Sequence, residues 1–416
     1  MKVLVLGGGV VGVAAAYYLG RDGHEVEVVE RNAAAASETS YGNAGLVSPG
    51  DSYAWASPTA LAVFIKSLYR RDLGIKVGIN LDPRFIAWTW KFLFECTHAR
   101  AHINTLRKLR LAFYSRTCIN DIQAHTDVAY DEGRKGILYF YRSQASLDAG
   151  AKHMQILADN GLTIEKIGRE RMVELEPGLA SAAHGIAGAL YSPLDQTGDS
   201  CKFSRNLASW CEQNLSVRLR FGTTVTSIET AGGKVTGIVT DKGKIAADAI
   251  VVALGPETPL VTRGIGLDIP IYPVKGYSAT IPLADPSVGP TMGGVDEDRL
   301  IAYSRLGDRL RVASTAEFAG YDRGHKPADF RRLLATAKDL FPGVVDESKA
   351  EFWAGLRPMT PTSVPILGPA RYPNLFLDCG HGHVGWTMAA GSGKFVADLV
   401  AGRKPEIDTD GLLYVN

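Results

Sequence analysis

Residues 2–31 read KVLVLGGGVVGVAAAYYLGRDGHEVEVVER, and this stretch decides the fold. Its pattern predicts a buried strand at 2–6, a glycine turn, an alanine-rich helix and a second strand at 25–30. A strand, a phosphate-binding turn, a helix and a strand within about 30 residues are typical of a dinucleotide-binding unit. The sequence therefore predicts an α/β domain with a Rossmann-like sheet.

Three glycines of the turn have separate expected roles. Gly7 allows a sharp turn, Gly9 lets the backbone approach a pyrophosphate, and Gly12 lets helix and strand pack closely. The phosphates would lie at the helix N-terminus, where free N–H groups favour anions. Glu30 closes the second strand, where its carboxylate can accept hydrogen bonds from ribose hydroxyls. An adenine dinucleotide without a 2′-phosphate is expected, although this unit alone does not separate NAD from FAD.

Composition limits the classes of protein. The 416 residues are 46% apolar, which is enough for a large core and more than one compact unit. Lys and Arg number 45 against 44 for Asp and Glu, with no block of like charge, so a nucleic-acid partner is not expected. The five cysteines are odd in number and lack CxxC spacing, so we expect reduced thiols and no structural disulfides.

Neither a secretory signal nor a membrane-spanning segment is expected, which favours a cytoplasmic protein. Apolar stretches such as FIAWTW at 85–90 are far shorter than the roughly 20 residues of a spanning helix. Residues 60–77 and 85–94 nevertheless combine aromatic, aliphatic and basic residues, as do helices at a bilayer surface. A core or interdomain helix is the favoured interpretation, and peripheral contact with the inner face of the cytoplasmic membrane is the alternative.

Two later segments favour a flavin over a nicotinamide. After Glu30 comes AAAASETSYGNAGLVSPG (33–50), small residues without a helical or strand period, which suit close backbone contact with a large ligand. A nicotinamide dehydrogenase would normally continue through further βα units. KIAADAIVVALG (244–255) is predicted as one strand that runs into a small-residue turn, so the chain is expected to cross between domains more than once.

A family resemblance extends over essentially the whole chain. The N-terminal unit resembles the D-amino-acid oxidase superfamily of FAD flavoproteins, and bacterial D-amino acid dehydrogenases of the small-subunit type most closely. The other motifs that carry the resemblance are SYGNAGLVSPG (40–50), PVKGYS (273–278), RLGDRLRVAST (305–315), GLRPMTP (355–361) and NLFLDCGHGHVGWTMAAGSG (374–393).

The resemblance implies two interleaved domains of the D-amino-acid oxidase and glycine oxidase type. The FAD-binding domain would comprise 1–50, 143–264 and 356–416, and a substrate domain on a mainly antiparallel sheet would comprise 51–142 and 265–355. FAD would be bound non-covalently, because Arg357 stands where sarcosine-oxidase-like relatives carry a flavin-linked cysteine. The implied FAD contacts are Gly7, Gly9, Val10, Val11, Gly12, Glu30, Arg31, Ser40, Asn43, Ala44, Gly45, Leu46, Val225, Ala253, Gly255, Gly382, His383, Val384, Gly385, Trp386 and Thr387.

The implied reaction removes a hydride from the α-carbon of a D-amino acid to flavin N5, giving an imino acid that water converts to a 2-oxo acid. D-proline and hydroxy-D-proline are candidate substrates. No side chain stands out as an essential base, and a substrate that enters with a neutral amine needs none. The expected acceptor is a quinone or the respiratory chain, with oxygen also open.

Two other functions stay open: a glycine- or sarcosine-type amine oxidase that uses oxygen, and an electron-transferring flavoprotein subunit of a hetero-oligomer. Arg357 argues against the second, because electron transfer needs no carboxylate clamp. A homo-oligomer is equally open. VAST at 312–315, where dehydrogenases often have VGGM, and His383, where GHGTLGW has threonine, make broad D-alanine-type specificity doubtful.

Five residues are candidates for the substrate site. The planar fork of Arg357 matches a carboxylate, and in this superfamily the Arg of the matching motif holds the substrate carboxylate. His383 occupies the position of an arginine that contacts the substrate in glycine oxidases. Tyr277 and Tyr303 lie on predicted strands, and Ser48 follows the implied flavin-contact loop.

Cys379, His381 and His383 stand at alternate positions, as metal ligands could. The intervening glycines indicate a turn, and no further Cys or His cluster completes a site, so no metal is predicted. The segment is instead predicted as a strand at 375–379, a glycine turn and a helix from about residue 384. The N–H groups of that helix would face the flavin C2 carbonyl and N1.

Overall fold

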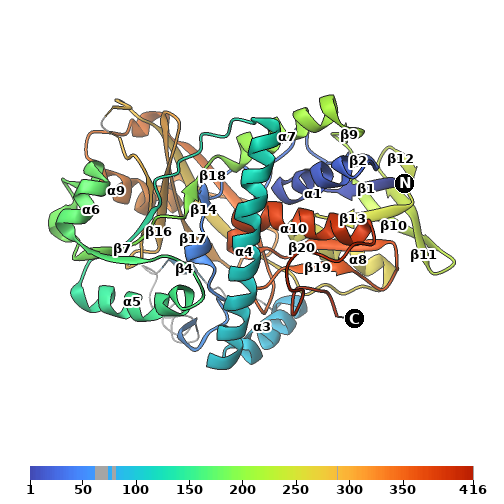
Figure 1. The fold of residues 1–416 in the computed structure, drawn as a ribbon, viewed down its shortest axis with the longest axis horizontal. Helices are drawn as coiled ribbons and strands as arrows, with labels where there is room; N and C mark the ends of the chain where they lie inside the picture. The colour runs from blue at the N-terminus through green and yellow to red at the C-terminus, as the bar shows by residue number, and fades with distance from the viewer. Residues whose placement is uncertain (61–73, 77–80, 288, 416) are drawn as a thin grey trace.

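The first unit folds as predicted. In this computed structural model, which describes residues 1–60, 74–76, 81–287 and 289–415, the chain begins with β1 (Lys2–Leu6), α1 (Val10–Arg21) and β2 (Glu25–Val29) (Figure 1). β1 and β2 pair in parallel within a six-stranded sheet. The order of this sheet is β19 (Ile366–Pro369), β20 (Leu375–Cys379), β13 (Ala249–Val252), β1, β2 and β9 (Val217–Arg220). Only the edge strand β19 runs antiparallel to its neighbour.

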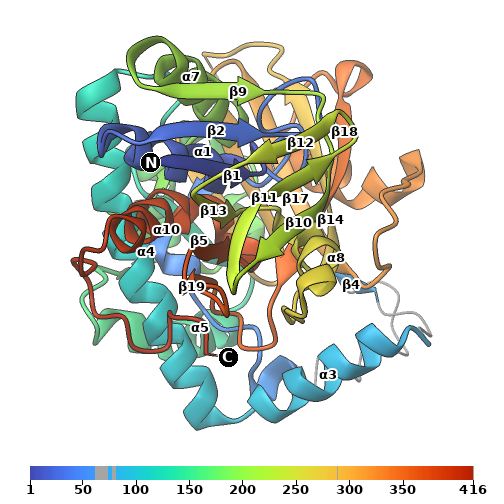
Figure 2. The ribbon, with the colours of Figure 1, turned by 90° about the vertical axis from the view of Figure 1, so that its right-hand side faces the viewer.

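Both faces of the six-stranded sheet are covered, because successive strand residues point to opposite sides. Val3 and Val5 face a cluster contributed by the helices α1, α4 (His98–Thr126), α7 (Ser200–Asn214) and α10 (Gly385–Val400). Leu4 and Leu6 face a second cluster on the other side. That side is covered by a small antiparallel sheet of β10 (Val225–Ala231), β11 (Lys234–Thr240) and β12 (Gly243–Ala246), seen in front in Figure 2.

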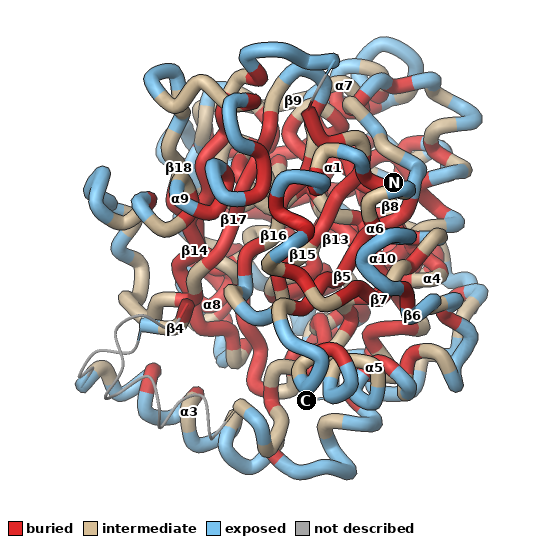
Figure 3. Tube along the Cα trace, turned by 90° about the vertical axis from the view of Figure 1, so that its left-hand side faces the viewer, coloured by how far each residue is buried: buried red, intermediate tan, exposed pale blue. Residues whose placement is uncertain are grey.

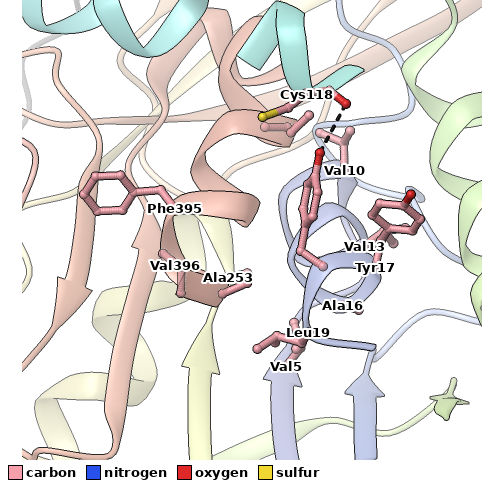
Figure 4. Packing of buried hydrophobic residues seen from close by; sticks show 14 of the residues in the cluster. Val5, Val10, Val13, Ala16, Tyr17, Leu19, Cys118, Ala253, Phe395 and Val396 are labelled. Atoms are coloured by element: carbon pink, nitrogen blue, oxygen red, sulfur yellow. Dashed lines mark hydrogen bonds between the residues drawn. The ribbon is translucent and has the colours of Figure 1, made fainter. Parts of the chain in front are cut away.

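Small residues let the helices approach closely, as the sequence AAGSG predicts. A Cβ atom at Gly393 of α10 would lie 2.7 Å from the backbone nitrogen of Ala15 in α1. A Cβ atom at Gly391 would lie 2.8 Å from the Cα of Ser115 in α4. The Tyr18 hydroxyl of α1 donates a hydrogen bond of 3.2 Å to the Cys118 carbonyl of α4, within the packing that Figure 4 shows. Three helices are therefore held together on this face.

The second large sheet is mainly antiparallel, which confirms the predicted fold class. Its parallel pairs are β5 (Ile137–Tyr141) with β15 (Gly293–Asp296) and β4 (Ile75–Lys76) with β17 (Arg309–Glu317). Its packed face meets a cluster that includes residues of α9 (Arg331–Leu340) and α6 (Arg169–Leu175). The strand order is β18 (Glu351–Met359), β14 (Tyr272–Pro282), β17 (Arg309–Glu317), β16 (Ile301–Leu306), β15 (Gly293–Asp296), β5 (Ile137–Tyr141), β7 (Gly188–Ser192) and β6 (Glu165–Gly168), with β4 (Ile75–Lys76) beside β17.

Two sheets thus lie on either side of α4, which runs down the middle of Figure 1. The chain passes between them repeatedly. β7 pairs with β5, and β6 with β7, in the mainly antiparallel sheet, although both fall within 143–264, the range assigned from sequence to the FAD-binding domain. In the opposite sense, α4 falls within 51–142 but packs on the helices of the parallel sheet.

The single strand predicted at 244–255 is wrong in one respect. The structure forms two strands there, β12 and β13, which belong to different sheets. The break falls at Asp248, whose carboxylate accepts a hydrogen bond of 2.7 Å from the backbone nitrogen of Lys2. The Asp248 carbonyl accepts a second bond, of 2.7 Å, from the Asn374 side chain. These contacts hold the residues between β12 and β13 beside the start of β1 and the residue before β20.

The helix α3 (Pro83–Glu95) lies at the surface and is only partly packed. Phe85 and Trp88 are buried against Tyr272 and Met359, whereas the outer residues of α3 are exposed, as Figure 3 shows. The predicted core helix therefore has one buried face and one exposed apolar face. Most of the other predicted helical segment, 60–77, lies outside the described residues.

Replacing Gly393 by valine should destabilise the fold by about 1–3 kcal/mol, because added carbons overpack the contact between α1 and α10. The midpoint of urea unfolding would measure this loss. Gly264→Val is the matched control, since a Cβ atom there meets nothing within 4 Å. Equal midpoints for the two variants would contradict the close helix contact.

Candidate active site

A cavity of about 1290 Å³ lies between the two large sheets. One end is lined by the glycine turn after β1 and the loop after β2, and the other by β14, β17 and β18. Typical small-molecule pockets measure roughly 300–1,000 Å³, so this cavity has room for a dinucleotide together with a small substrate.

The glycines at the first end have steric surroundings that a side chain would disturb or that leave the backbone open. Gly7 has φ +105°, and a Cβ atom there would lie 2.5 Å from the Ala253 carbonyl oxygen. A Cβ atom at Gly12 would lie 2.0 Å from the Gly7 carbonyl oxygen, so Gly12 serves the packing of helix on strand and does not line the cavity. At Gly9 the nearest atom would be the Ser40 hydroxyl oxygen at 3.3 Å, which leaves the backbone open to a ligand.

The Glu30 carboxylate is held in place at the end of β2. One oxygen accepts a hydrogen bond of 2.8 Å from the backbone nitrogen of Gly8. The other accepts bonds of 2.8 and 2.7 Å from the backbone and side-chain nitrogens of Asn32. Next to it, Arg31 pairs with Glu38 at 2.6 Å and with Glu257 at 3.1 Å. A carboxylate fixed in this way can accept hydrogen bonds from ribose hydroxyls at the cavity wall.

Every FAD contact predicted from sequence lines the cavity except Gly12. The lining residues come from turns that lie far apart in the sequence. They are Gly7, Gly9, Val10, Val11, Glu30, Arg31, Ser40, Asn43, Ala44, Gly45, Leu46, Val225, Ala253, Gly255, Gly382, His383, Val384, Gly385, Trp386 and Thr387.

The second glycine turn sends its three candidate metal ligands in different directions. His381 lies 2.8 Å from the Ser392 hydroxyl and 3.4 Å from the Asp378 carboxylate. Burial raises the pKa of the Cys379 thiol. His383 stacks on Trp55 instead. Across the described residues, no group of three or more His, Cys, Asp or Glu side chains is placed to hold a metal ion. β20 ends at Cys379 and α10 begins at Gly385, as the turn prediction requires.

Arg357 of β18 presents its guanidinium to the cavity. One of its N–H groups donates a hydrogen bond of 2.6 Å to the Thr315 carbonyl. A Cβ atom at Gly276 would lie 2.7 Å from the Arg357 Cζ, so this glycine leaves room for the flat group. Burial lowers the pKa of Arg357 to about 10, against the opposing influence of Asp51, so the side chain stays cationic at neutral pH. A cation with free donors in an enclosed cavity can bind a carboxylate through two hydrogen bonds.

His383 is uncharged in this position. Its ring stacks on Trp55 at 4.8 Å, and its Nε2 lies 3.3 Å from the Asp51 carbonyl, which places the proton on Nε2. Burial lowers the pKa of His383 well below its usual value, helped by the charges of Lys108 and Arg357. Its Nδ1 is buried and has no hydrogen-bond partner in the described part of the chain. The ring therefore offers a bound molecule an acceptor without a charge.

The remaining three candidates differ in whether they line the cavity. Tyr277 lines the cavity, and its hydroxyl donates a hydrogen bond of 2.5 Å to Glu317. Ser48 also lines the cavity and donates a bond of 3.0 Å to Asp195. Tyr303 does not reach the cavity, which corrects its predicted place: strand alternation turns Ala302 inward, so Tyr303 points into the core and packs edge-on against Phe341 at 5.0 Å.

Sequence reasoning missed several cavity residues, namely Asp51, Trp55 and Glu297. Asp51 directly follows the loop 40–50 that carries the family motif, so its position was a usable signal. Lys108, a fully buried lysine of α4 near the cavity, was also missed. No local pattern marks it, because its surroundings come from segments about 50 residues or more away, such as the Tyr53 carbonyl to which it donates.

The cavity combines glycine turns that suit a dinucleotide with a buried arginine. These features are typical of a protein that binds a large redox cofactor beside a small anionic ligand.

A family model described as FAD dependent oxidoreductase matches residues 2–399. The D-amino acid dehydrogenase 2 of Mesorhizobium japonicum is 62% identical over 414 residues, with 100% of both chains covered. The D-amino acid dehydrogenase of Allorhizobium ampelinum is 44% identical over 412 residues, covering 99% of this chain and 97% of its own.

Solved structures agree on the fold. Glycine oxidase from Geobacillus kaustophilus superposes with a TM-score of 0.76 at 21% identity, covering 100% of this chain and 99% of its own. Iminodiacetate oxidase from Chelativorans superposes with a TM-score of 0.73 at 22% identity, covering 99% and 98%. The chain belongs to the DAO family of FAD-dependent oxidoreductases.

The residues present fit FAD. α1 and α10 both begin at the cavity, so the positive N-terminal ends of two helices face it, one beside each glycine turn. The open backbone at Gly9 and the fixed carboxylate of Glu30 suit the pyrophosphate and the ribose. The turn at Gly382, with φ +62°, precedes α10 and would face the part of the cofactor that gains negative charge on reduction.

Proposed function

We propose that this protein is a dehydrogenase that oxidises D-amino acids to imino acids, which water then converts to 2-oxo acids. The observation that carries the proposal is the guanidinium of Arg357, which faces the FAD cavity with donors free for a carboxylate. Relatives at 62% and 44% identity bear the name D-amino acid dehydrogenase, which supports the same substrate class. D-proline and hydroxy-D-proline are included among the proposed substrates.

The protein's own residues bind and orient the substrate in this proposal. Arg357 holds the carboxylate, and the uncharged ring of His383 contacts the substrate beside it. Tyr277 and Ser48 line the same space. FAD, held without a covalent link by the glycine turns and Glu30, would supply the two-electron oxidation of the α-carbon. Enclosure between two sheets excludes bulk water, which strengthens the interaction between Arg357 and a carboxylate.

We also propose a two-domain organisation built on the ranges 1–50, 143–264 and 356–416 for FAD and 51–142 and 265–355 for the substrate. The sheet pairing supports one refinement, in which β6 and β7 join the substrate domain. The packing of α4 on α1 and α10 supports a second, in which this helix joins the FAD domain.

The proposed electron acceptor is a quinone, reached by peripheral contact with the inner face of the cytoplasmic membrane. The outer face of α3 exposes Ile86, Trp90, Leu93 and Phe94, and Leu81, two residues before the helix, is exposed as well. Trp90 is 60% and Phe94 70% exposed, and Arg84 and Lys91 lie on the same helix. This composition suits the interface of an anionic bilayer. Every helix in the described part of the chain is too short or too polar to cross a membrane.

A panel of amino acids mixed with the purified protein under anaerobic conditions tests the substrate class. We expect D-amino acids or cyclic D-imino acids to bleach the flavin absorbance, and their L-enantiomers to leave it unchanged. Bleaching by glycine or sarcosine alone would contradict this proposal and favour an amine oxidase.

The proposed acceptor is tested by re-oxidation of the reduced protein. Re-oxidation by a soluble quinone faster than by dissolved oxygen would support a quinone as the acceptor.

Replacing Arg357 by leucine should weaken substrate binding by about 2–5 kcal/mol, because the carboxylate would lose its buried cationic partner. The substrate concentration that half-saturates flavin reduction would measure this loss. FAD content should stay unchanged. Arg371→Leu is the control, because Arg371 is exposed and lies outside the cavity. An unchanged half-saturating substrate concentration in Arg357→Leu would contradict the proposed role of Arg357 in binding the carboxylate.

The double variant Trp90→Gln and Phe94→Gln should lose most binding to phosphatidylglycerol vesicles, because these side chains supply exposed apolar area at α3. Co-sedimentation would measure the bound fraction. Leu194→Gln serves as the control, since Leu194 is 37% exposed and lies outside α3. Equal sedimentation of both variants would place any membrane contact elsewhere.

A further inference from the structure

Asp51 is an acidic group at the substrate end of the cavity that the carboxylate clamp does not use. It ends the short helix η1 (Pro49–Asp51). Its backbone carbonyl is contacted by His383, so the two residues lie on one wall. Its carboxylate forms no hydrogen bond or ion pair with another described residue. It therefore retains its acceptor capacity for a bound molecule.

The neighbouring carboxylate of Asp195 differs, because the protein satisfies it. Asp195 accepts bonds of 2.7 Å from the Tyr139 hydroxyl and 3.0 Å from the Ser48 hydroxyl. The backbone nitrogen of Gly50 lies 3.3 Å from both of its oxygens. Asp195 thus supports the loop that carries Asp51. It has little capacity left for a substrate.

Several charged or titratable groups surround Asp51. Lys108 of α4 is fully buried, and its ammonium group donates to the Tyr53 carbonyl, with no ion pair to Asp51. Burial lowers the pKa of Lys108 to about 7, with Asp51 opposing the shift, and the protonated form acts on Asp51 through space. The groups that interact with Asp51, from every element around it, are Lys108, Arg357, Asp195, Glu297, Tyr53, Tyr139 and His383.

The position relative to Arg357 distinguishes Asp51 from Glu297, which also lines the cavity. Asp51 and Arg357 are close enough for each charge to shift the pKa of the other. Glu297 interacts with Asp51, Asp296 and Asp298 rather than with the arginine. In an amino acid the nitrogen is only two bonds from the carboxylate carbon. The group that receives the nitrogen must therefore lie beside the group that holds the carboxylate.

We propose that Asp51 binds the ammonium group of the substrate and removes one proton from it. This inference rests on the proposed function, in which Arg357 holds the carboxylate. In the step, an N–H bond of the ammonium breaks and an O–H bond forms on Asp51. The nitrogen keeps the electron pair and becomes a neutral amine, and no oxidation occurs. The proton leaves Asp51 for bulk water when the product departs.

The neutral amine matters because its lone pair can form the new C=N bond as the α-carbon loses its hydride. A protonated nitrogen has no such pair. Burial raises the pKa of Asp51 to about 6, against the lowering influence of Lys108, so the side chain is an ionised base at neutral pH. Below that pKa Asp51 is protonated and cannot accept the proton. The rate of flavin reduction by substrate should therefore fall as pH falls through about 6.

Asp51→Asn tests the proposal by its pH dependence. At about pH 7, the second-order rate constant for anaerobic flavin reduction should fall roughly 100-fold or more, with whichever D-amino acid reduces the wild-type protein fastest. Near pH 10 much of the substrate is already a neutral amine, so most of the loss should be recovered. Binding of propanoate, a carboxylate without an amine, should be unchanged when followed by flavin absorbance. Asp285→Asn, an exposed site outside the cavity, is the control for charge removal.

The outcomes separate the two proposals. Normal rates for Asp51→Asn at pH 7, or a loss of equal size at every pH, would overturn the role of Asp51 and leave the substrate class intact. If no D-amino acid reduces the flavin of the wild-type protein, both the proposed substrate class and the proposed role of Asp51 are contradicted. If Asp51→Asn does not fold, Lys108→Met replaces it, and the acid limb of the rate profile should move to higher pH. An unmoved limb would equally overturn the proposal.

Discussion

The close contact between α1 and α10 is the constraint on which the remaining structure depends. The two helices begin at separate glycine turns, and their contact at Ala15 and Gly393 fixes both beginnings at one cavity. Because each helix end presents free N–H groups, two electropositive ends converge where FAD must lie. A bulky side chain at this contact would spread the helices and separate the turns. The small residues of α10 therefore serve the cofactor site through packing, without touching the ligand.

The sequence was sufficient where the signal is local. The unit at 2–31 and the turn before α10 are continuous patterns, so their strands, turns and helices were predicted from the residues. Their cavity contacts came from the family resemblance, and of these only Gly12 does not line the cavity. Prediction from the sequence failed where the position of a residue depends on contacts with distant segments. Strand periodicity places Tyr277 and Tyr303 on strands but cannot say which face meets the cavity, and only Tyr277 does. Likewise, nothing local assigns β6 and β7 to one sheet or identifies Lys108 as a neighbour of Asp51.

Burial changes the chemistry of the charged and titratable groups at the substrate end of the cavity. Burial lowers the pKa of Arg357 without neutralising it, keeps His383 uncharged and raises the pKa of Asp51. The same low-polarity surroundings strengthen the attraction between these groups and a charged ligand. The cavity therefore offers a cation, a neutral ring and a carboxylate at its substrate end. A zwitterion complements this arrangement better than a simple carboxylate or a simple amine does.

The order of strands in the parallel sheet also constrains how the protein is made. β13 lies between β1, from the first residues of the chain, and β20, whose segment starts only at residue 375. During synthesis on a ribosome, β13 therefore has one edge unpaired until the residues of β20 have emerged. The second helix end of the cofactor site appears later still. The complete cofactor site can therefore form only after α10 has emerged, and a chain released before β20 would expose an unpaired strand edge.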